Sequence, residues 1–208
     1  MRLYVSKSLV FLTIVKGIFA IALFLSLFLW SVPILSFNST LWLILQERSG
    51  VVLNEDVKTY NNQIVDFFRT GLKLDFLNEN EFSHMEDVKT VITIANILFG
   101  FSFVSLISGF SYLSRSQKKF LLNSVRKTSV FVFVTTLILS MLILTNFHTA
   151  FLSFHKIFFV KNFIFPADSM LKILYPDEFF LGLSSLYLLS VLLVSFLVAV
   201  VSHRLKLK

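Results

Sequence analysis

The stretch ENEFSHMEDVK, residues 79–89, passes directly into TVITIANILFGFSFVSLISGFSYLS, residues 90–114. The first part is rich in charge, whereas the second contains no Asp, Glu, Lys or Arg. About 20 predominantly apolar residues are enough for an α-helix to cross the hydrocarbon core of a membrane. Asn78 with Glu81 three residues later matches a capping box. The sequence therefore predicts one helix that begins near residue 79 and continues without a break into a membrane span.

Three further runs lack all four charged residue types, and they cover residues 17–46, 128–155 and 179–203. The chain of 208 residues is 56% hydrophobic and 15% charged, which is more apolar than a soluble domain of this size needs to be. The sequence predicts an all-α membrane protein of one domain, 1–208, with four transmembrane helices. The expected spans are about 8–31, 90–113, 129–147 and 180–201.

Positive charge is concentrated in the N-terminal arm, the segment 114–128 and the C-terminal tail. These segments hold 11 of the 19 Lys and Arg residues and none of the 12 Asp and Glu residues. Short loops rich in Lys and Arg stay on the cytoplasmic side. Both termini and the inner loop 114–128 are therefore expected inside, and the segments 36–89 and 148–179 outside. The net charge of +7 follows from this topology, and we expect no nucleic-acid partner.

The first outer segment contains a predicted helical cap. Asn54 suits the N-cap of a helix and Gly71 suits its end. Between them, one face at helical spacing carries Val57, Tyr60, Asn61, Ile64, Val65 and Phe68. This pattern predicts an amphipathic helix that packs on the membrane bundle. Tyr60 and Asn61 face the bundle in this reading, either as functional groups or as residues that satisfy local hydrogen bonds.

The second outer segment is expected to lie at the membrane interface. Residues 146–159 are too apolar for an ordinary loop and too few to cross the membrane again before Phe179. Irregular backbone at that depth has to be buried in protein. We therefore predict an interfacial or re-entrant segment before the last helix.

Several kinds of chemistry lack support in the sequence. The chain has no cysteine, which excludes thiol nucleophiles and structural disulfides. Motifs of zinc proteases and serine hydrolases are missing. The predicted spans contain no acid and no arginine, which argues against an ion-coupled transporter. No metal or cofactor is expected, and the reactive groups that remain are histidines at the outer boundary.

Two of the four histidines are expected at the same outer depth. His84 shares a helix face with Asp87, and a carboxylate can fix an imidazole tautomer and raise its basicity. His155 lies in the predicted interfacial segment. Each is either a hydrogen-bonded interface residue or a general base. His148 follows the third span, and His203 belongs to the basic tail.

Two short motifs resemble those of a known family. His84-Met85-Glu86-Asp87-Val88 precedes a span, and Phe154-His155-Lys156-Ile157-Phe158-Phe159 is followed by Tyr175-Pro176-Asp177-Glu178-Phe179-Phe180. Over nearly its whole length the chain is similar to the lipoprotein intramolecular transacylases of low-GC Gram-positive bacteria. It departs from them at Phe163-Ile164-Phe165, where a tryptophan is expected.

The resemblance implies a reaction on a diacylated lipoprotein in the membrane. The sn-2 acyl chain of the diacylglyceryl-cysteine moves to the cysteine α-amine and leaves a lyso-form lipoprotein. No enzyme nucleophile is required, because the substrate amine attacks the ester itself. Under this resemblance His84 and His155 are the expected acid/base pair, with Asp87 orienting His84. Tyr60, Asn61 and Asn146 are expected to contact substrate or support the site.

Three other functions are compatible with parts of the sequence. A membrane adaptor would use the outer segment to bind an extracytoplasmic partner. A small transporter would need polar groups along the spans, which offer mainly Ser, Thr, Asn96 and the inner-edge Lys16. An acyltransferase that takes its acyl chain from a phospholipid would use the same histidines. The oligomeric state does not follow from the sequence.

Overall fold

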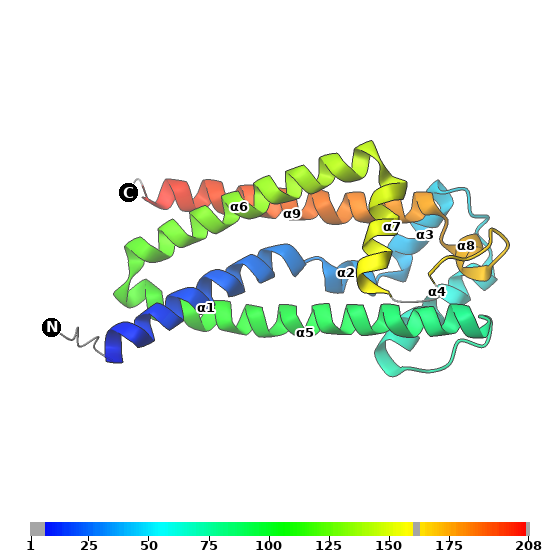
Figure 1. The fold of residues 1–208 in the computed structure, drawn as a ribbon, viewed down its shortest axis with the longest axis horizontal. Coiled ribbons are helices and arrows are strands. Elements are labelled where there is room, and N and C mark those ends of the chain that lie inside the picture. Colours follow the sequence, from blue (N-terminus) through cyan, green and yellow to red (C-terminus); the bar gives the residue numbers. More distant parts are fainter. Residues whose placement is uncertain (1–6, 160–162, 207–208) are drawn as a thin grey trace. The chain divides into compact units, whose positions relative to one another are not determined.

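The computed structural model describes residues 7–159 and 163–206, and within them every regular element is a helix (Figure 1). The helices are α1 (Lys7–Leu29), α2 (Val32–Ser36), α3 (Ser39–Arg48), α4 (Glu55–Thr70), α5 (Glu79–Ser116), α6 (Lys118–Thr145), α7 (Phe147–Phe158), α8 (Met170–Leu174) and α9 (Asp177–Lys206). Four stretches are long and apolar enough to cross a membrane: Ser8–Ser36, Glu79–Ser116, Lys118–Thr145 and Asp177–Leu205. The prediction of an all-α, four-span membrane protein is confirmed.

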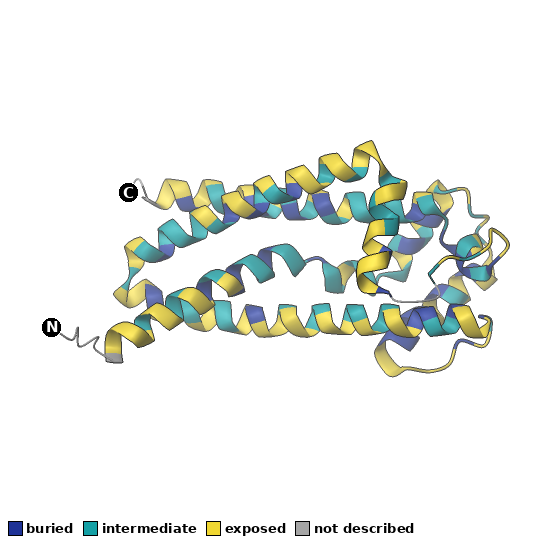
Figure 2. Cartoon of the chain, in the orientation of Figure 1, coloured by how far each residue is buried: buried dark blue, intermediate teal, exposed yellow. Residues whose placement is uncertain are grey.

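The long helices expose apolar side chains. In the most apolar window of α5, 6% of the residues are buried, and in those of α6 and α9 the share is 17%. Exposed and intermediate residues accordingly make up most of these helices in Figure 2, and buried residues are few. Exposing apolar surface to water costs about 25 cal/mol per Å², whereas lipid tails solvate it without that cost. The exposed surface is thus suited to a membrane.

The chain forms two compact units. The first comprises Met1–Trp30, Ile97–Leu137 and Ser190–Lys208, and the second comprises Ser31–Asn96 and Ile138–Leu189. Helices α5, α6 and α9 each contribute residues to both units. The three basic segments belong to the first unit, and the predicted outer segments 36–89 and 148–179 belong to the second.

In the first unit, α1 and α5 approach closely at a glycine. A Cβ atom at Gly109 would lie 3.0 Å from the Phe19 ring, so only glycine leaves that ring undisturbed. The expected inner loop 114–128 is helical except for Gln117, which lies between the end of α5 and the start of α6. Its basic residues are therefore carried on helix ends.

In the second unit, the predicted amphipathic helix is present as α4. The Asn54 side chain accepts a hydrogen bond from the Val57 amide at 2.9 Å, and Gly71 ends the helix with φ of 82°. At that positive φ a side chain would be strained. Five residues of the predicted face are buried: Val57, Asn61, Ile64, Val65 and Phe68. Local capping and periodicity thus explain where α4 begins, ends and packs.

Helix α3 supplies a second wall of the same core. Asn38 caps it by accepting a hydrogen bond from the Leu41 amide at 2.9 Å. Trp42, Leu45 and Gln46 are buried in the core with side chains from α4, α8 and the start of α9. The α3 segment, residues 39–48, therefore supports the second unit from within.

Candidate active site

The second unit contains a cavity of about 450 Å³. Most of the residues that line it are aliphatic or phenylalanine, and we call it the apolar cavity. His84 from α5, His155 from α7 and Lys172 from α8 also line it. The volume lies within the usual range of ligand pockets, about 300–1,000 Å³. An apolar chain with one reactive polar group is the kind of ligand that fits this lining.

Helix α5 fixes His84 at the cavity wall. The predicted capping box is confirmed: the Asn78 amide donates to Glu81 Oε2 and the Glu81 amide to Asn78 Oδ1, both at 3.0 Å. The other oxygen of this buried carboxylate accepts the Leu171 amide of α8 at 3.1 Å. One turn further along α5, His84 is 7% exposed, and its Nδ1 has no hydrogen-bond partner. Glu81 therefore holds α8 next to the turn that carries His84.

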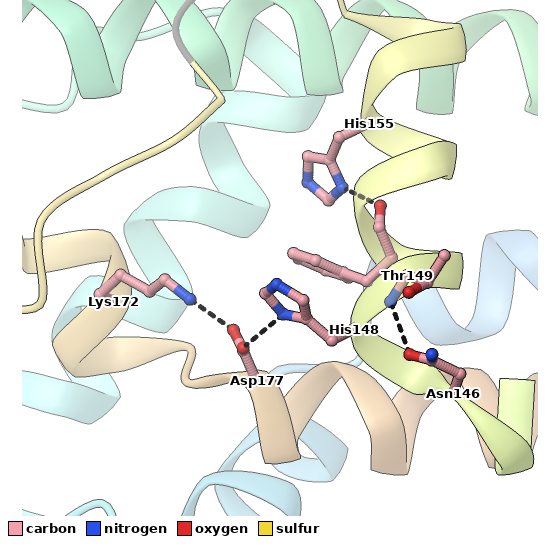
Figure 3. A network of polar contacts seen from close by, with 7 residues as sticks. Asn146, His148, Thr149, His155, Lys172 and Asp177 are labelled. Atoms are coloured by element: carbon pink, nitrogen blue, oxygen red, sulfur yellow. Dashed lines mark hydrogen bonds and ion pairs between the residues drawn. The ribbon is translucent and has the colours of Figure 1, made fainter.

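Helix α7 presents His155 to the same cavity with a defined tautomer. His155 is 8% exposed, and its Nδ1 lies 2.8 Å from the Phe151 carbonyl oxygen (Figure 3). Because a carbonyl only accepts hydrogen bonds, we assign the proton to Nδ1. In the neutral ring, Nε2 then carries a free lone pair.

The two imidazole rings lie almost parallel. Their centroids are 5.9 Å apart and their planes differ by 23°. The Phe159 ring contacts both, with centroids 4.8 Å from His84 and 5.3 Å from His155. Phe163 and Phe165 lie near His155 and His84, at 5.9 and 5.4 Å respectively. Phenylalanine rings thus occupy the segment where a tryptophan was expected.

The surroundings of His155 favour its neutral form. Burial lowers the pKa of the imidazole below its ordinary value, and the charge of Lys172 acts in the same direction. The hydrogen bond to Phe151 and the charge of Asp177 oppose this shift without reversing it. A neutral imidazole with a free Nε2 can accept a proton.

The other predicted site residues lie away from the apolar cavity. Asp87 is exposed and does not line the cavity, and no hydrogen bond joins it to His84 among the described contacts, so its orienting role stays a prediction. Tyr60 stacks on Phe76 at 4.2 Å beside a separate surface hollow. Asn146 is exposed and caps α7 by accepting the Thr149 amide at 3.1 Å.

Asn61 belongs to a buried hydrogen-bond network in the core of the second unit. Its Nδ2 donates to Gln46 Oε1 at 2.7 Å, and its Oδ1 accepts from Gln46 Nε2 at 3.2 Å. The same oxygen accepts the Tyr175 hydroxyl at 2.7 Å. Gln46 Nε2 also donates to the Leu174 carbonyl at 2.9 Å. Asn61 was expected either to act as a functional group or to satisfy local hydrogen bonds, and these contacts match the second alternative.

Replacing Asn61 with leucine is expected to destabilise the protein by about 2–4 kcal/mol, because Gln46 and Tyr175 are left with unsatisfied buried groups. Thermal unfolding of the purified protein in detergent measures the effect. The neighbouring Tyr60→Phe variant is the control and should change stability by less than about 0.5 kcal/mol. Equal melting temperatures for Asn61→Leu and the unmodified protein would contradict the structural role.

Sequence reasoning missed an ion pair at the edge of the site. Lys172 pairs with Asp177 at the start of α9, and His148 Nδ1 lies 4.0 Å from Asp177 Oδ2 (Figure 3). Asp177 stands within the second resembling motif, which could have drawn attention to it. Nothing in the sequence around Lys172 marks it as a site residue.

Metal ligands do not cluster in the described part of the chain. There, no group of three or more His, Cys, Asp or Glu side chains could hold a metal ion.

Taken together, the fold and site define a multi-pass membrane protein in which a histidine pair lines an apolar cavity. The model of the family "lipoprotein intramolecular transacylase Lit" matches residues 4–180, which is most of the chain. The chain belongs to this family, and it is accordingly an acyltransferase.

Solved structures of the lipoprotein intramolecular transacylase Lit from Bacillus cereus share the fold. One has a TM-score of 0.81 and 17% identity, over 93% of this chain and 95% of that chain. A structure of that protein with a histidine changed to arginine has a TM-score of 0.74 and 17% identity, over 93% of this chain and 91% of that chain. A structure with a histidine changed to alanine has a TM-score of 0.73 and 18% identity, over 93% of each chain. A search of curated protein sequences finds no match.

Proposed function

We propose that this protein transfers the sn-2 acyl chain of a diacylglyceryl-cysteine lipoprotein to the α-amine of the same cysteine. The observation that carries the proposal is the pair of imidazole rings, 5.9 Å apart, on the wall of an apolar cavity. The acyl chain occupies the apolar lining, and the ester lies beside the nitrogen-bearing edges of the two rings. The product is an N-acylated lipoprotein with a free sn-2 hydroxyl group.

His155 acts as the base. The amine nitrogen attacks the ester carbonyl carbon while His155 Nε2 takes its proton. The carbon–oxygen bond to the glyceryl group then breaks, and the same proton passes to the leaving sn-2 oxygen. His84 donates a ring N–H hydrogen bond to that oxygen and holds it near His155. Proton-transfer groups of this kind typically contribute about 10²–10⁴-fold each.

No covalent enzyme intermediate forms in this route. The attack closes a ring within the substrate, through the amine, the cysteine, the sulfur, the glyceryl carbons and the ester. The enzyme contributes orientation, because holding both groups in one cavity makes the reaction effectively unimolecular. The absence of cysteine from the chain is compatible with this route.

The proposed topology puts the site on the extracytoplasmic side of a single membrane domain. The basic N-terminal arm, the segment 114–128 and the C-terminal tail are cytoplasmic, as their lack of acids favours. Segments 36–89 and 148–179, which carry both histidines, are then outside. Cysteine-labelling of single-cysteine variants at exposed Val52 and Ser116 tests this, with only the Val52 position reacting in intact cells.

The function is tested by mass spectrometry of a lipoprotein N-terminal peptide from cells that express this chain. The lyso form, with the acyl chain on nitrogen, is the expected product. A diacylglyceryl peptide that keeps its free amine would contradict the proposal and favour a membrane adaptor. An isotope-labelled phospholipid donor separates the intramolecular route from transfer out of a phospholipid, since the label enters the amide only in the second case.

The limb of the pH–rate profile that belongs to His155 is expected below the ordinary histidine range, at lower pH than the limb of the substrate α-amine. Burial lowers the pKa of His155 from 6.5, so its basic, neutral form remains populated at pH values where an exposed histidine is charged. The measurement is kcat against pH at saturating substrate, which reports groups in the enzyme–substrate complex. Since the substrate α-amine must also lose its proton, kcat should fall with the slope of one protonation below the pKa of the amine and more steeply below the pKa of His155. A fall with the slope of one protonation throughout the acid range would contradict the assignment of His155 as the base.

A further inference from the structure

Lys172 brings a charge to the wall of the apolar cavity. Among the described residues that line it, Lys172 is the only Lys, Arg, Asp or Glu. Its side chain is 34% exposed, so it reaches both the cavity and the surface. The proposed proton transfers assign no role to this group.

Two contacts hold Lys172 in place. Its ammonium group donates to Asp177, whose other oxygen lies 4.0 Å from His148 (Figure 3). The adjacent Leu171 amide donates to Glu81, one turn before His84 on α5. The lysine is therefore fixed relative to α5 by Glu81 and relative to α9 by Asp177.

We infer that the Lys172 ammonium group stabilises the negative charge that develops on the ester carbonyl oxygen during acyl transfer. This inference rests on the proposed function. As the amine nitrogen bonds to the carbonyl carbon, one electron pair of the C=O bond moves onto oxygen. When the bond to the sn-2 oxygen breaks, that pair returns, and Lys172 keeps its proton throughout.

The apolar lining makes this charge effective. Electrostatic interactions are stronger in a cavity of low dielectric constant than in water, and a positioned cation needs no reorganisation during the reaction. Lys172 lines the cavity and Asp177 does not, so the lysine is the member of the ion pair that contacts the apolar wall. The charges of Lys172 and Asp177 act on His155 in opposite directions, which places the ion pair within electrostatic range of the reacting groups.

The test compares variants that differ in the lysine charge alone. Asp177→Asn keeps the cation, whereas the double variant Lys172→Met/Asp177→Asn removes it without leaving an unpaired carboxylate. The substrate is a synthetic diacylglyceryl-cysteine peptide, and the full-length enzyme is purified in detergent. We expect the double variant to have a kcat on the order of 10²–10³-fold below that of Asp177→Asn, with KM changed by less than about threefold.

Two further variants check the reason for the loss. Lys172→Arg keeps the charge and should recover more than about one tenth of the lost kcat. Lys156→Met, on exposed α7 surface, should leave kcat unchanged within about twofold. Thermal unfolding of each variant separates loss of rate from loss of fold.

The inference is overturned if the double variant and Asp177→Asn have the same kcat, because the ion pair would then matter only for structure. Equal losses in Lys172→Arg and the double variant would also overturn it. The unmodified enzyme provides the separate test of the proposed function: if it forms no lyso product, that function fails, whatever the variants do.

Discussion

The His155→Ala variant is expected to lose about 10²–10⁴-fold in kcat, because it removes the group proposed to take the amine proton. The free Nε2 of His155 is a consequence of the 2.8 Å contact between Nδ1 and the Phe151 carbonyl. Lyso product formed by the purified enzyme from a synthetic diacylglyceryl peptide measures the loss. The same assay should show KM nearly unchanged, since the side chain acts on the reacting atoms.

His155→Asn separates chemistry from folding. An asparagine amide can still donate to the Phe151 carbonyl, but it cannot accept a proton at neutral pH. This variant should therefore unfold at the temperature of the unmodified protein and be as inactive as His155→Ala. His203→Ala, an exposed histidine in the basic tail, is the control for histidine loss and should keep full activity. An active His155→Asn enzyme would rule out His155 as the base.

The His84→Ala variant is expected to lose activity to a similar extent, about 10²–10⁴-fold in kcat. The ring lies 5.9 Å from that of His155, and its proposed N–H donor holds the leaving oxygen. When two groups act as a unit, removing both costs little more than removing either. The double variant His84→Ala/His155→Ala should therefore be about as active as each single variant in the same product assay.

Asp87→Asn is the matched comparison for His84. The resemblance to the family implies that Asp87 orients the ring, but the side chain is exposed and makes no hydrogen bond to it. We expect kcat within about threefold of the unmodified enzyme. A loss as large as that of His84→Ala would support the orienting role of Asp87, and full activity of His84→Ala would exclude His84 from the proton transfers.

Much of the fold follows from short-range patterns in the sequence. Four uncharged runs predict the four long helices, because a helix satisfies its own backbone hydrogen bonds in lipid. Asn54 and Gly71 predict the ends of α4, and Asn78 with Glu81 predicts the start of α5. Each of these signals depends on residues close together in the sequence, so the helices and their ends can be predicted without knowledge of the tertiary structure.

The prediction for Tyr60 and Asn61 depended on which side of α4 each side chain occupies. Tyr60 and Asn61 are adjacent on α4, yet Tyr60 lies beside a surface hollow while Asn61 is fully buried. Periodicity put both on one broad face. The partners of Asn61 decide the difference: Gln46 and Tyr175 come from α3 and from the segment before α9, and no local pattern links them.

By itself, the sequence determined that this is an all-α, four-span membrane protein, and its motifs pointed to His84 and His155. Only the tertiary structure decided that the two rings lie 5.9 Å apart, that the cavity is apolar and that Lys172 borders it. The physical reason is the range of the interactions. Hydropathy and helix capping act along the chain, whereas ring stacking and cavity lining join side chains from α5, α7 and α8 that only packing brings together.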